Sequence, residues 1–274
     1  MRWARVEVNG EAVHGIVEAD QIALVEGGLF DGGLDGGGAR TGQTVALADA
    51  KFLIPLEPKT FYAAGLNYAE HVIAVAKANN KEPNIPTDAH IGYRANNALI
   101  AHNQSIIKPS DASEEFQYEA ELVAIIGKQA KNLSEADALN CVFGYTIGND
   151  VSERVWQRAD RTLWRAKNTD TFAPMGPWIE TDVDLDSLTT IVRLNGREVI
   201  SFATNNMIFG VARYISAMSR YFTLYPGDMV WMGTEGHAEN MKPGDICEIE
   251  ITGIGTLSNP IVAQALSDEA TSVR

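Results

Sequence analysis

The sequence predicts a β-rich α+β protein in which a small N-terminal β domain precedes a larger domain built on a mixed, mostly antiparallel sheet. Residues 2–25 hold short segments of alternating apolar and polar side chains, and Asn9-Gly10 between the first two is typical of a hairpin turn. Asn195-Gly196 gives the same signal between IVRL and EVISF. Hairpins of this kind favour antiparallel pairing over an array of parallel βαβ units.

A proline-containing segment divides the chain. Residues 53–59, LIPLEPK, contain two prolines and predict an extended linker. We therefore expect a small N-terminal domain over residues 1–56, a larger domain over 57–266 and a frayed tail over 267–274. The glycine-rich stretch 27–38 lacks the GxxxxGK[ST] pattern of a phosphate-binding loop, so it is interpreted as a surface loop.

Composition excludes several classes of function. The chain has 274 residues, is 45% hydrophobic and carries a formal net charge of −14, which supports a full core but disfavours nucleic acid and anionic membrane partners. Its two cysteines, Cys141 and Cys247, form no disulfide framework or CxxC zinc pattern, so we expect a reducing, cytoplasmic setting. We expect neither an N-terminal signal region nor a membrane span, because no apolar run approaches 18 residues.

Two helices are predicted in the larger domain. Asn67 can cap a helix that continues to about Asn79 and carries His71, and the polar, proline-containing loop 79–90 that follows could act as a lid. On its helix, His71 is either a functional group or an ordinary surface histidine. The apolar stripe from Met207 to Phe222 predicts a core helix.

The acidic segment Phe116 to Lys128, FQYEAELVAIIGK, is the first candidate for chemistry. Glu119 and Glu121 lie two residues apart in a strand pattern, so their side chains share a face, about 7 Å apart along the strand. Two carboxylates on an apolar strand resist burial unless positive charge lies between them, and Mg²⁺ suits such a site. The alternative is a half-exposed strand with solvated glutamates.

A second set of polar residues follows the apolar segment Cys141 to Asn149. Asp150 ends this predicted strand, where a third ligand or an ordinary turn residue is equally at home. Arg154 and Gln157 follow Asp150 at spacings of four and seven, which would place all three on one helix face, although a solvated charged helix has the same pattern. Lys167 lies in the irregular loop that comes next.

Six blocks of the sequence, in order, resemble the fumarylacetoacetate hydrolase superfamily. The resemblance covers roughly residues 60–262. The blocks are GLNYAEH at 65–71, YEAELVAIIGK at 118–128, GYTIGND at 144–150, RAKNTDTFAPMGPWI at 165–179, YPGDMVWMGT at 225–234 and KPGDICEIEITGIGTL at 242–257. The resemblance implies a mixed β-sheet roll for the catalytic domain, a small N-terminal domain and a homodimer.

The same resemblance implies roles for individual residues. Family members hold Mg²⁺ or Mn²⁺ with three carboxylates and act on small keto or enol acids, and the matching ligands here are Glu119, Glu121 and Asp150. The remaining matches are substrate contacts at Arg154, Gln157 and Thr234, a lysine for the developing enolate charge at Lys167, and a general base at His71.

Three departures from the family pattern bear on the reaction. Many members place a glutamate three residues after the histidine, where this chain has Ala74, so His71 must act alone or rely on Glu70 or Glu82. A family lysine ahead of the metal strand is replaced by Arg94, which is expected to take over its contact with substrate. The family TGTP turn is MGTEGH here, which puts Glu235 and His237 at the pocket rim.

These features lead to three hypotheses. The preferred one is a divalent-metal-dependent hydrolase that cleaves a C–C bond in an acylpyruvate-like β-diketo acid, in the breakdown of aromatic or related compounds. The second is a decarboxylase, isomerase or hydratase/dehydratase of a small 2-keto or enol acid on the same scaffold. The third is a family member that binds metal and ligand without turnover.

Overall fold

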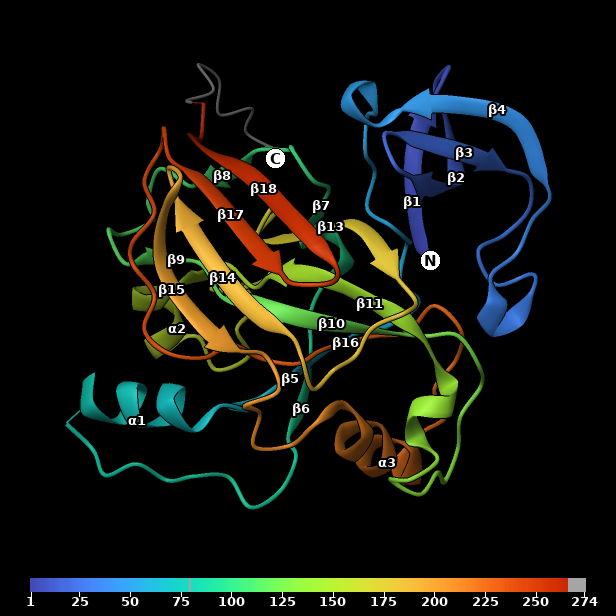
Figure 1. Ribbon diagram of the computed structural model, residues 1–274. Helices are drawn as coiled ribbons and strands as arrows, with labels where there is room; N and C mark the ends of the chain where they lie inside the picture. Colours follow the sequence, from blue (N-terminus) through green and yellow to red (C-terminus); the bar gives the residue numbers. More distant parts are fainter. Residues whose placement is uncertain (79, 266–274) are drawn as a thin grey trace, which may run out of the picture.

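Strands form most of the regular secondary structure, and the computed structural model describes residues 1–78 and 80–265 (Figure 1). The strands are β1 (Arg2–Val8), β2 (Glu11–Glu18), β3 (Gln21–Val25), β4 (Arg40–Ala46), β5 (Phe61–Ala64), β6 (Ile91–Tyr93), β7 (Leu99–Ile100), β8 (Ile106–Lys108), β9 (Phe116–Gln117), β10 (Ala120–Ile126), β11 (Val142–Asn149), β12 (Ser152–Glu153), β13 (Ala173–Glu180), β14 (Thr189–Leu194), β15 (Arg197–Ala203), β16 (Met229–Trp231), β17 (Ile246–Ile251) and β18 (Gly255–Ala263). The α-helices are α1 (Ala69–Ala78), α2 (Arg154–Ala159) and α3 (Val211–Tyr221). The expected tail at 267–274 lies outside the described residues.

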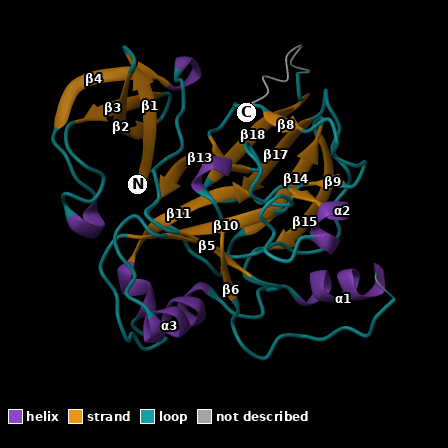
Figure 2. Ribbon diagram, turned by 180° about the vertical axis from the view of Figure 1, so that it is seen from behind, coloured by secondary structure: helices purple, strands orange, loops and turns teal. Residues whose placement is uncertain are grey.

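Two large sheets carry the fold, and the predicted β-rich, mixed architecture is confirmed. The larger sheet has the order β4-β3-β2-β1-β13-β11-β10-β16-β5-β6, with β7 beside β13, and the smaller has the order β15-β14-β17-β18-β8. Most neighbours are antiparallel, whereas β16–β5, β13–β7 and β18–β8 are parallel. Figure 2 shows the same arrangement from behind, with α1, α2 and α3 at the edges of the strands.

The N-terminal strands extend the larger sheet. In Figure 1, β1 to β4 lie together beside the rest of the molecule. The β1 strand pairs with β13 at Arg2↔Glu180 and Trp3↔Ile179, so the N-terminal group continues the sheet that carries β10 and β11. The predicted linker lies between β4 and β5 and belongs to neither strand group.

Strand β10 lies at the centre of the core. All of its residues are buried, because both of its faces are covered. On one face Leu122 and Ala124 pack in a cluster with Ile249 of the smaller sheet. On the other face Val123 and Ile125 pack in a second cluster, which includes Trp231 and other aromatic side chains. Because the strand is buried on both faces, its first residues have fixed positions, and Glu119 and Glu121 lie at this end.

Three local predictions differ from the structure. The third helix begins at Val211 instead of Met207, because the backbone N–H groups of Ile208 and Phe209 donate to Asn67 and hold that segment outside the helix. Helix α2 begins at Arg154, so Asp150 precedes it and shares no helix face with it. Glu119 lies one residue before β10, whereas the sequence pattern predicts it within the strand.

Close packing between β11 and β16 gives a test of the core. A Cβ atom built on Gly148 would lie 2.5 Å from Cζ3 of Trp231, a fully buried side chain, so the indole must move to accept it. We expect Gly148→Ala to lower the free energy of unfolding by about 1–3 kcal/mol, measured by urea denaturation.

Gly92→Ala is the matched control, since it makes the same change in β6 of the same sheet. The nearest atom to a Cβ at Gly92 is 3.8 Å away, which is an ordinary contact. Its effect should stay within about 0.5 kcal/mol of zero. Equal losses in the two variants would contradict the packing at Trp231.

Candidate active site

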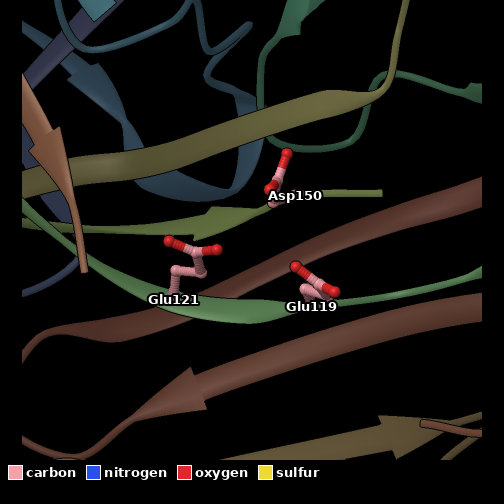
Figure 3. Close-up of side chains that lie close together, drawn as sticks. All are labelled: Glu119, Glu121 and Asp150. Carbon is pink, nitrogen blue, oxygen red and sulfur yellow. The ribbon is translucent and has the colours of Figure 1, made fainter. Parts of the chain in front are cut away.

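Three buried carboxylates meet at the junction of β10 and β11. Glu119, Glu121 and Asp150 each offer an oxygen, and these oxygens all lie within 4.8 Å of one another (Figure 3). The sheet register explains the meeting: β10 and β11 are antiparallel, with Glu121 opposite Gly148, so the end of β11 adjoins the start of β10. The backbone N–H of Asp150 donates to the carbonyl of Glu119 at 2.9 Å and joins the two ends.

Three cationic side chains surround two of these carboxylates. The ammonium of Lys167 donates to Glu119 Oε2 and to Asp150 Oδ2, at 2.6 Å each. Arg154 donates to Glu119 Oε1 at 2.6 Å, and Arg94 donates to both oxygens of Asp150 at 3.1 and 2.9 Å. Burial alone would raise the pKa of both carboxyls, but Lys167 with Arg154 lowers that of Glu119, and Arg94 with Lys167 lowers that of Asp150.

Glu121 differs from the other two carboxylates in its surroundings. Its Oε2 accepts a hydrogen bond from the backbone N–H of Gly233 at 2.7 Å, and it takes part in no salt bridge within the described part of the chain. Burial, followed by the charges of Asp150 and Glu119, raises its pKa well above the usual range.

The cluster therefore has the composition of a site for a divalent cation. Three acidic side chains meet in a buried space, and among the described residues Glu121 forms no salt bridge. Carboxylate oxygens are the ligands that Mg²⁺ and Mn²⁺ prefer. The residues present thus fit such an ion, with Glu119, Glu121 and Asp150 as its holders.

His71 lies in the first turn of α1, and a backbone carbonyl fixes its orientation. Its Nδ1 lies 2.8 Å from the carbonyl oxygen of Gly236. A carbonyl oxygen can only accept, so Nδ1 must carry the proton, and in the neutral ring this leaves Nε2 as a proton acceptor. The orienting role that a carboxylate could have played from position 74 belongs here to the main chain.

Two adjoining cavities connect these groups. The inner cavity has a volume of about 230 Å³ and contains the carboxylates at its wall, and the outer one has a volume of about 480 Å³. Both cavities are lined by His71 and Gln157, so the two spaces meet at these side chains. The inner lining also includes Gly65, Asn67, Arg94, Leu163, Lys167 and Thr234. The outer lining also includes Ala74, Glu115, Gln117, Arg154, Arg158 and His237.

The structure brings together the residues proposed as metal ligands, substrate contacts, enolate partner and base. Of the two residues expected at the pocket rim, His237 lines the outer cavity, whereas Glu235 is buried and lines neither cavity. Gln157 and Thr234 line the inner cavity, as do Arg94 and Lys167, and Arg154 lines the outer one while pairing with Glu119. Arg94, expected to contact substrate, is engaged by Asp150 through both oxygens.

The two acids considered as partners for His71 are placed elsewhere. Glu70 and Glu82 are exposed, and neither lines the inner or the outer cavity. Neither acid can therefore replace the glutamate that many family members have at the position of Ala74.

Sequence patterns did not indicate several residues that hold the site residues in place. Gln117 Oε1 accepts from Arg154 Nε at 2.8 Å, and Asn149 Oδ1 accepts from the backbone N–H of Glu119 at 3.0 Å. Gly233 and Gly236 act through main-chain atoms, which leave no side-chain signal. Their positive φ values, 85° and 77°, do explain why glycine stands at these two positions.

The chain matches two family models, which together cover most of its length. A family model described as the C-terminal domain of fumarylacetoacetate (FAA) hydrolase matches residues 60–262, and a model described as Rv2993c-like, N-terminal, matches residues 1–55. Fumarylacetoacetate hydrolase domain-containing protein 2 homolog of Dictyostelium discoideum is 39% identical over 238 residues, which are 79% of this chain and 76% of that protein.

Two further relatives are named for reactions of organic acids. The 2,4-didehydro-3-deoxy-L-rhamnonate hydrolase of a Sphingomonas species is 33% identical over 275 residues, which are 93% of this chain and 94% of that one. The crystal structure of 5-carboxymethyl-2-hydroxymuconate delta-isomerase from Mycobacterium smegmatis superposes with a TM-score of 0.85 at 34% identity, covering 96% of this chain and all of that one. On these matches, the chain belongs to the fumarylacetoacetate hydrolase family.

Proposed function

We propose that this chain is a hydrolase that depends on Mg²⁺ or Mn²⁺ and cleaves a C–C bond in an acylpyruvate-like β-diketo acid, in the breakdown of aromatic or related compounds. One observation carries the proposal. Three buried carboxylates converge at the wall of a cavity that is also lined by a histidine whose Nδ1 is held by a carbonyl. The hydrolase among the relatives, which acts on a keto-acid derivative by its name, supports the same reaction class.

The metal would be held by Glu119, Glu121 and Asp150. When bound, the ion supplies Lewis-acid polarisation of the substrate's keto-acid oxygens and favours the negative charge that develops there. Mg²⁺ and Mn²⁺ suit the all-oxygen donor set equally well.

The remaining side chains would bind and orient the keto-acid end. Thr234 and Gln157 lie in the inner cavity and offer a hydroxyl and an amide to the substrate's carboxylate and keto oxygens. Arg154 and Arg94, each paired with a carboxylate, keep the site positive enough to receive an anionic substrate. The acyl end of the substrate would extend past His71 into the outer cavity.

His71 would move the proton. Its Nε2 takes a proton from water, and the resulting hydroxide attacks the carbonyl carbon of the acyl group. The bond from that carbon to the methylene group then breaks, the acyl group leaves as a carboxylic acid, and the electron pair remains as a pyruvate enolate. The ammonium of Lys167 stabilises the enolate charge, and the proton held by His71 returns to the methylene carbon to give pyruvate.

A second candidate function is kept for a specific reason. Ala74 leaves His71 without a carboxylate, and a relative of 34% identity over nearly the whole chain is named as an isomerase. If His71 activated water too weakly for hydrolysis, the same site would instead catalyse decarboxylation, isomerisation, hydration or dehydration of the keto-acid end of its substrate. The chemistry would still use a small 2-keto or enol acid.

We also propose a homodimer in the cytoplasm that binds neither nucleic acid nor membrane. Exposed aromatic side chains such as Trp164, 69% exposed, and Tyr221, 83% exposed, could be covered by a second copy. Cys141 and Cys247 are both free and buried, which suits a reducing compartment. Among the described residues, no helix is long and apolar enough to cross a membrane.

Because Glu121 forms no salt bridge among the described residues, it gives a prediction for metal binding. Without metal, Glu121→Gln should unfold at a temperature no lower than the parent protein, because an ionised carboxylate with a raised pKa costs folding free energy at neutral pH. Mg²⁺ or Mn²⁺ should raise the melting temperature of the parent protein and leave that of the variant unchanged. An equal metal-induced rise in both proteins would contradict the assigned ligand.

Glu119→Gln and Asp150→Asn serve as the contrasting pair. Each removes charge from a carboxylate that holds buried cations, so both should lower the melting temperature even without metal. Both should also abolish metal-dependent turnover of acylpyruvates, whereas Glu18→Gln, on an exposed N-terminal strand, should retain it. Turnover that survives in both site variants would overturn the metal-dependent mechanism.

Removal of the proposed base should separate chemistry from metal binding. We expect His71→Ala to lower kcat on acylpyruvates by about 10²–10⁴-fold, because a positioned general base contributes that much. Its metal-induced rise in melting temperature should equal that of the parent protein. His90→Ala, at an exposed position outside both cavities, is the control and should keep full activity.

Product analysis distinguishes the two candidate functions. The purified protein with Mg²⁺ or Mn²⁺ is offered acylpyruvates, oxaloacetate and 2-hydroxydienoates, and the products are identified by mass spectrometry. We expect acylpyruvates to give a carboxylic acid and pyruvate. Carbon dioxide from oxaloacetate, or an isomerised or hydrated dienoate, without acylpyruvate cleavage would favour the second candidate.

A further inference from the structure

Glu235, a departure from the family turn, is a buried acid with an amide partner. Its side chain is 8% exposed, and the Nδ2 of Asn206 donates to both of its carboxylate oxygens at 3.1 Å. The two residues lie far apart in sequence, with Asn206 in the segment between β15 and α3. Burying a carboxylate is costly, so this contact must be maintained by the surrounding fold.

The residue after Glu235 supplies the carbonyl that orients the proposed base. Gly236 accepts from His71 Nδ1 at 2.8 Å. Gly236 has a φ of +77°, and a Cβ there would lie 2.5 Å from Cδ1 of Ile200, so its backbone is packed closely in an unusual conformation. The direction of this carbonyl therefore depends on how the residues beside it are held.

The same turn also reaches the carboxylate cluster. The N–H of Gly233, three residues before Gly236, donates to Glu121 at 2.7 Å. Residues 233–236 therefore contact a proposed metal ligand at one end and the proposed base at the other. The contact between Glu235 and Asn206 lies between these two points.

Asn206 belongs to a segment that also fixes the start of α1. The N–H of Ile208 donates to the carbonyl of Asn67 at 2.7 Å, and the hydroxyl of Tyr68 donates to the carbonyl of Thr204 at 2.6 Å. Residues 204–208 thus hold the helix that carries His71 while Asn206 holds the turn that carries Gly236. This segment sets the position of both partners of the His71 hydrogen bond.

We propose that Glu235 and Asn206 are positioning residues that hold the Gly236 carbonyl against His71 Nδ1 and so keep Nε2 available as the proton acceptor. The catalytic part of this proposal rests on the proposed function, whereas the tautomer of His71 is a property of the folded protein.

The test compares Glu235→Ala and Asn206→Ala with a matched control. Asn205→Ala is that control, since the neighbouring asparagine donates instead to the carbonyl of Asp186 at 3.2 Å, on the exposed surface. The first readout is ¹⁵N NMR of the metal-free full-length proteins labelled at histidine, with the His71 signals assigned by their loss in His71→Ala. The second is kcat and KM on an acylpyruvate with Mg²⁺.

The expected results separate positioning from stability. The parent protein and Asn205→Ala should show His71 protonated at Nδ1, and the two site variants should show a mixture of tautomers. The kcat of both site variants should fall about tenfold, a loss typical of outer partners of a site, with KM changed less than twofold. Glu235→Gln keeps one acceptor oxygen for Asn206, so its His71 tautomer mixture and its kcat should lie between those of the parent protein and those of the alanine variants. This variant provides the test if the alanine variants fail to fold.

Two outcomes would overturn the proposal. One is an unchanged Nδ1–H tautomer in the folded site variants, and the other is an equal loss in Asn205→Ala. If the parent protein turns over no acylpyruvate, the proposed function fails, while the tautomer comparison still decides the positioning role.

Discussion

The site depends on buried charges that are held in direct contact with one another. Three carboxylates lie within 4.8 Å of one another, and the cations in contact with them serve Glu119 and Asp150 while Glu121 has a backbone N–H. Strands β10 and β11 are buried along their length, so the ends that carry these groups are held at a fixed place. Glu121 is the carboxyl whose pKa is raised by burial and by the charges of Asp150 and Glu119. The three carboxyl groups together offer oxygens of the kind that a divalent ion prefers.

Lys167 joins two of the carboxylates. Its ammonium bridges Glu119 and Asp150, and it also lines the inner cavity. Under the proposed function, a metal held by the same carboxylates would share them with Lys167, and the ammonium would be close enough to stabilise an enolate in that cavity.

Side-chain spacing singled out Glu119 and Glu121 as a pair and left Asp150 open as a third ligand, while the family resemblance assigned the ligand set and the roles of the other site residues. The strand argument held for Glu121, whereas Glu119 lies one residue before β10. Main-chain geometry accounts for what both kinds of prediction missed. The glycine carbonyl that orients His71 was not predicted, since a carbonyl accompanies every residue and its direction depends on contacts distant in sequence. For the same reason the start of α3 was misplaced: apolar spacing predicted a longer helix, but hydrogen bonds to Asn67 keep residues 208 and 209 outside it.

The two cavities meet at His71 and Gln157 but otherwise have separate linings. All three carboxylates belong to the inner cavity, whereas Ala74, Arg158 and His237 belong to the outer one. Under the proposed function, substitutions at Ala74 or His237 would change which acyl group is accommodated and leave the ion pairs of the carboxylates intact, whereas Arg154 of the outer lining pairs with Glu119. The choice of acyl group would then be able to diverge during evolution at these two positions while the carboxylate cluster is preserved.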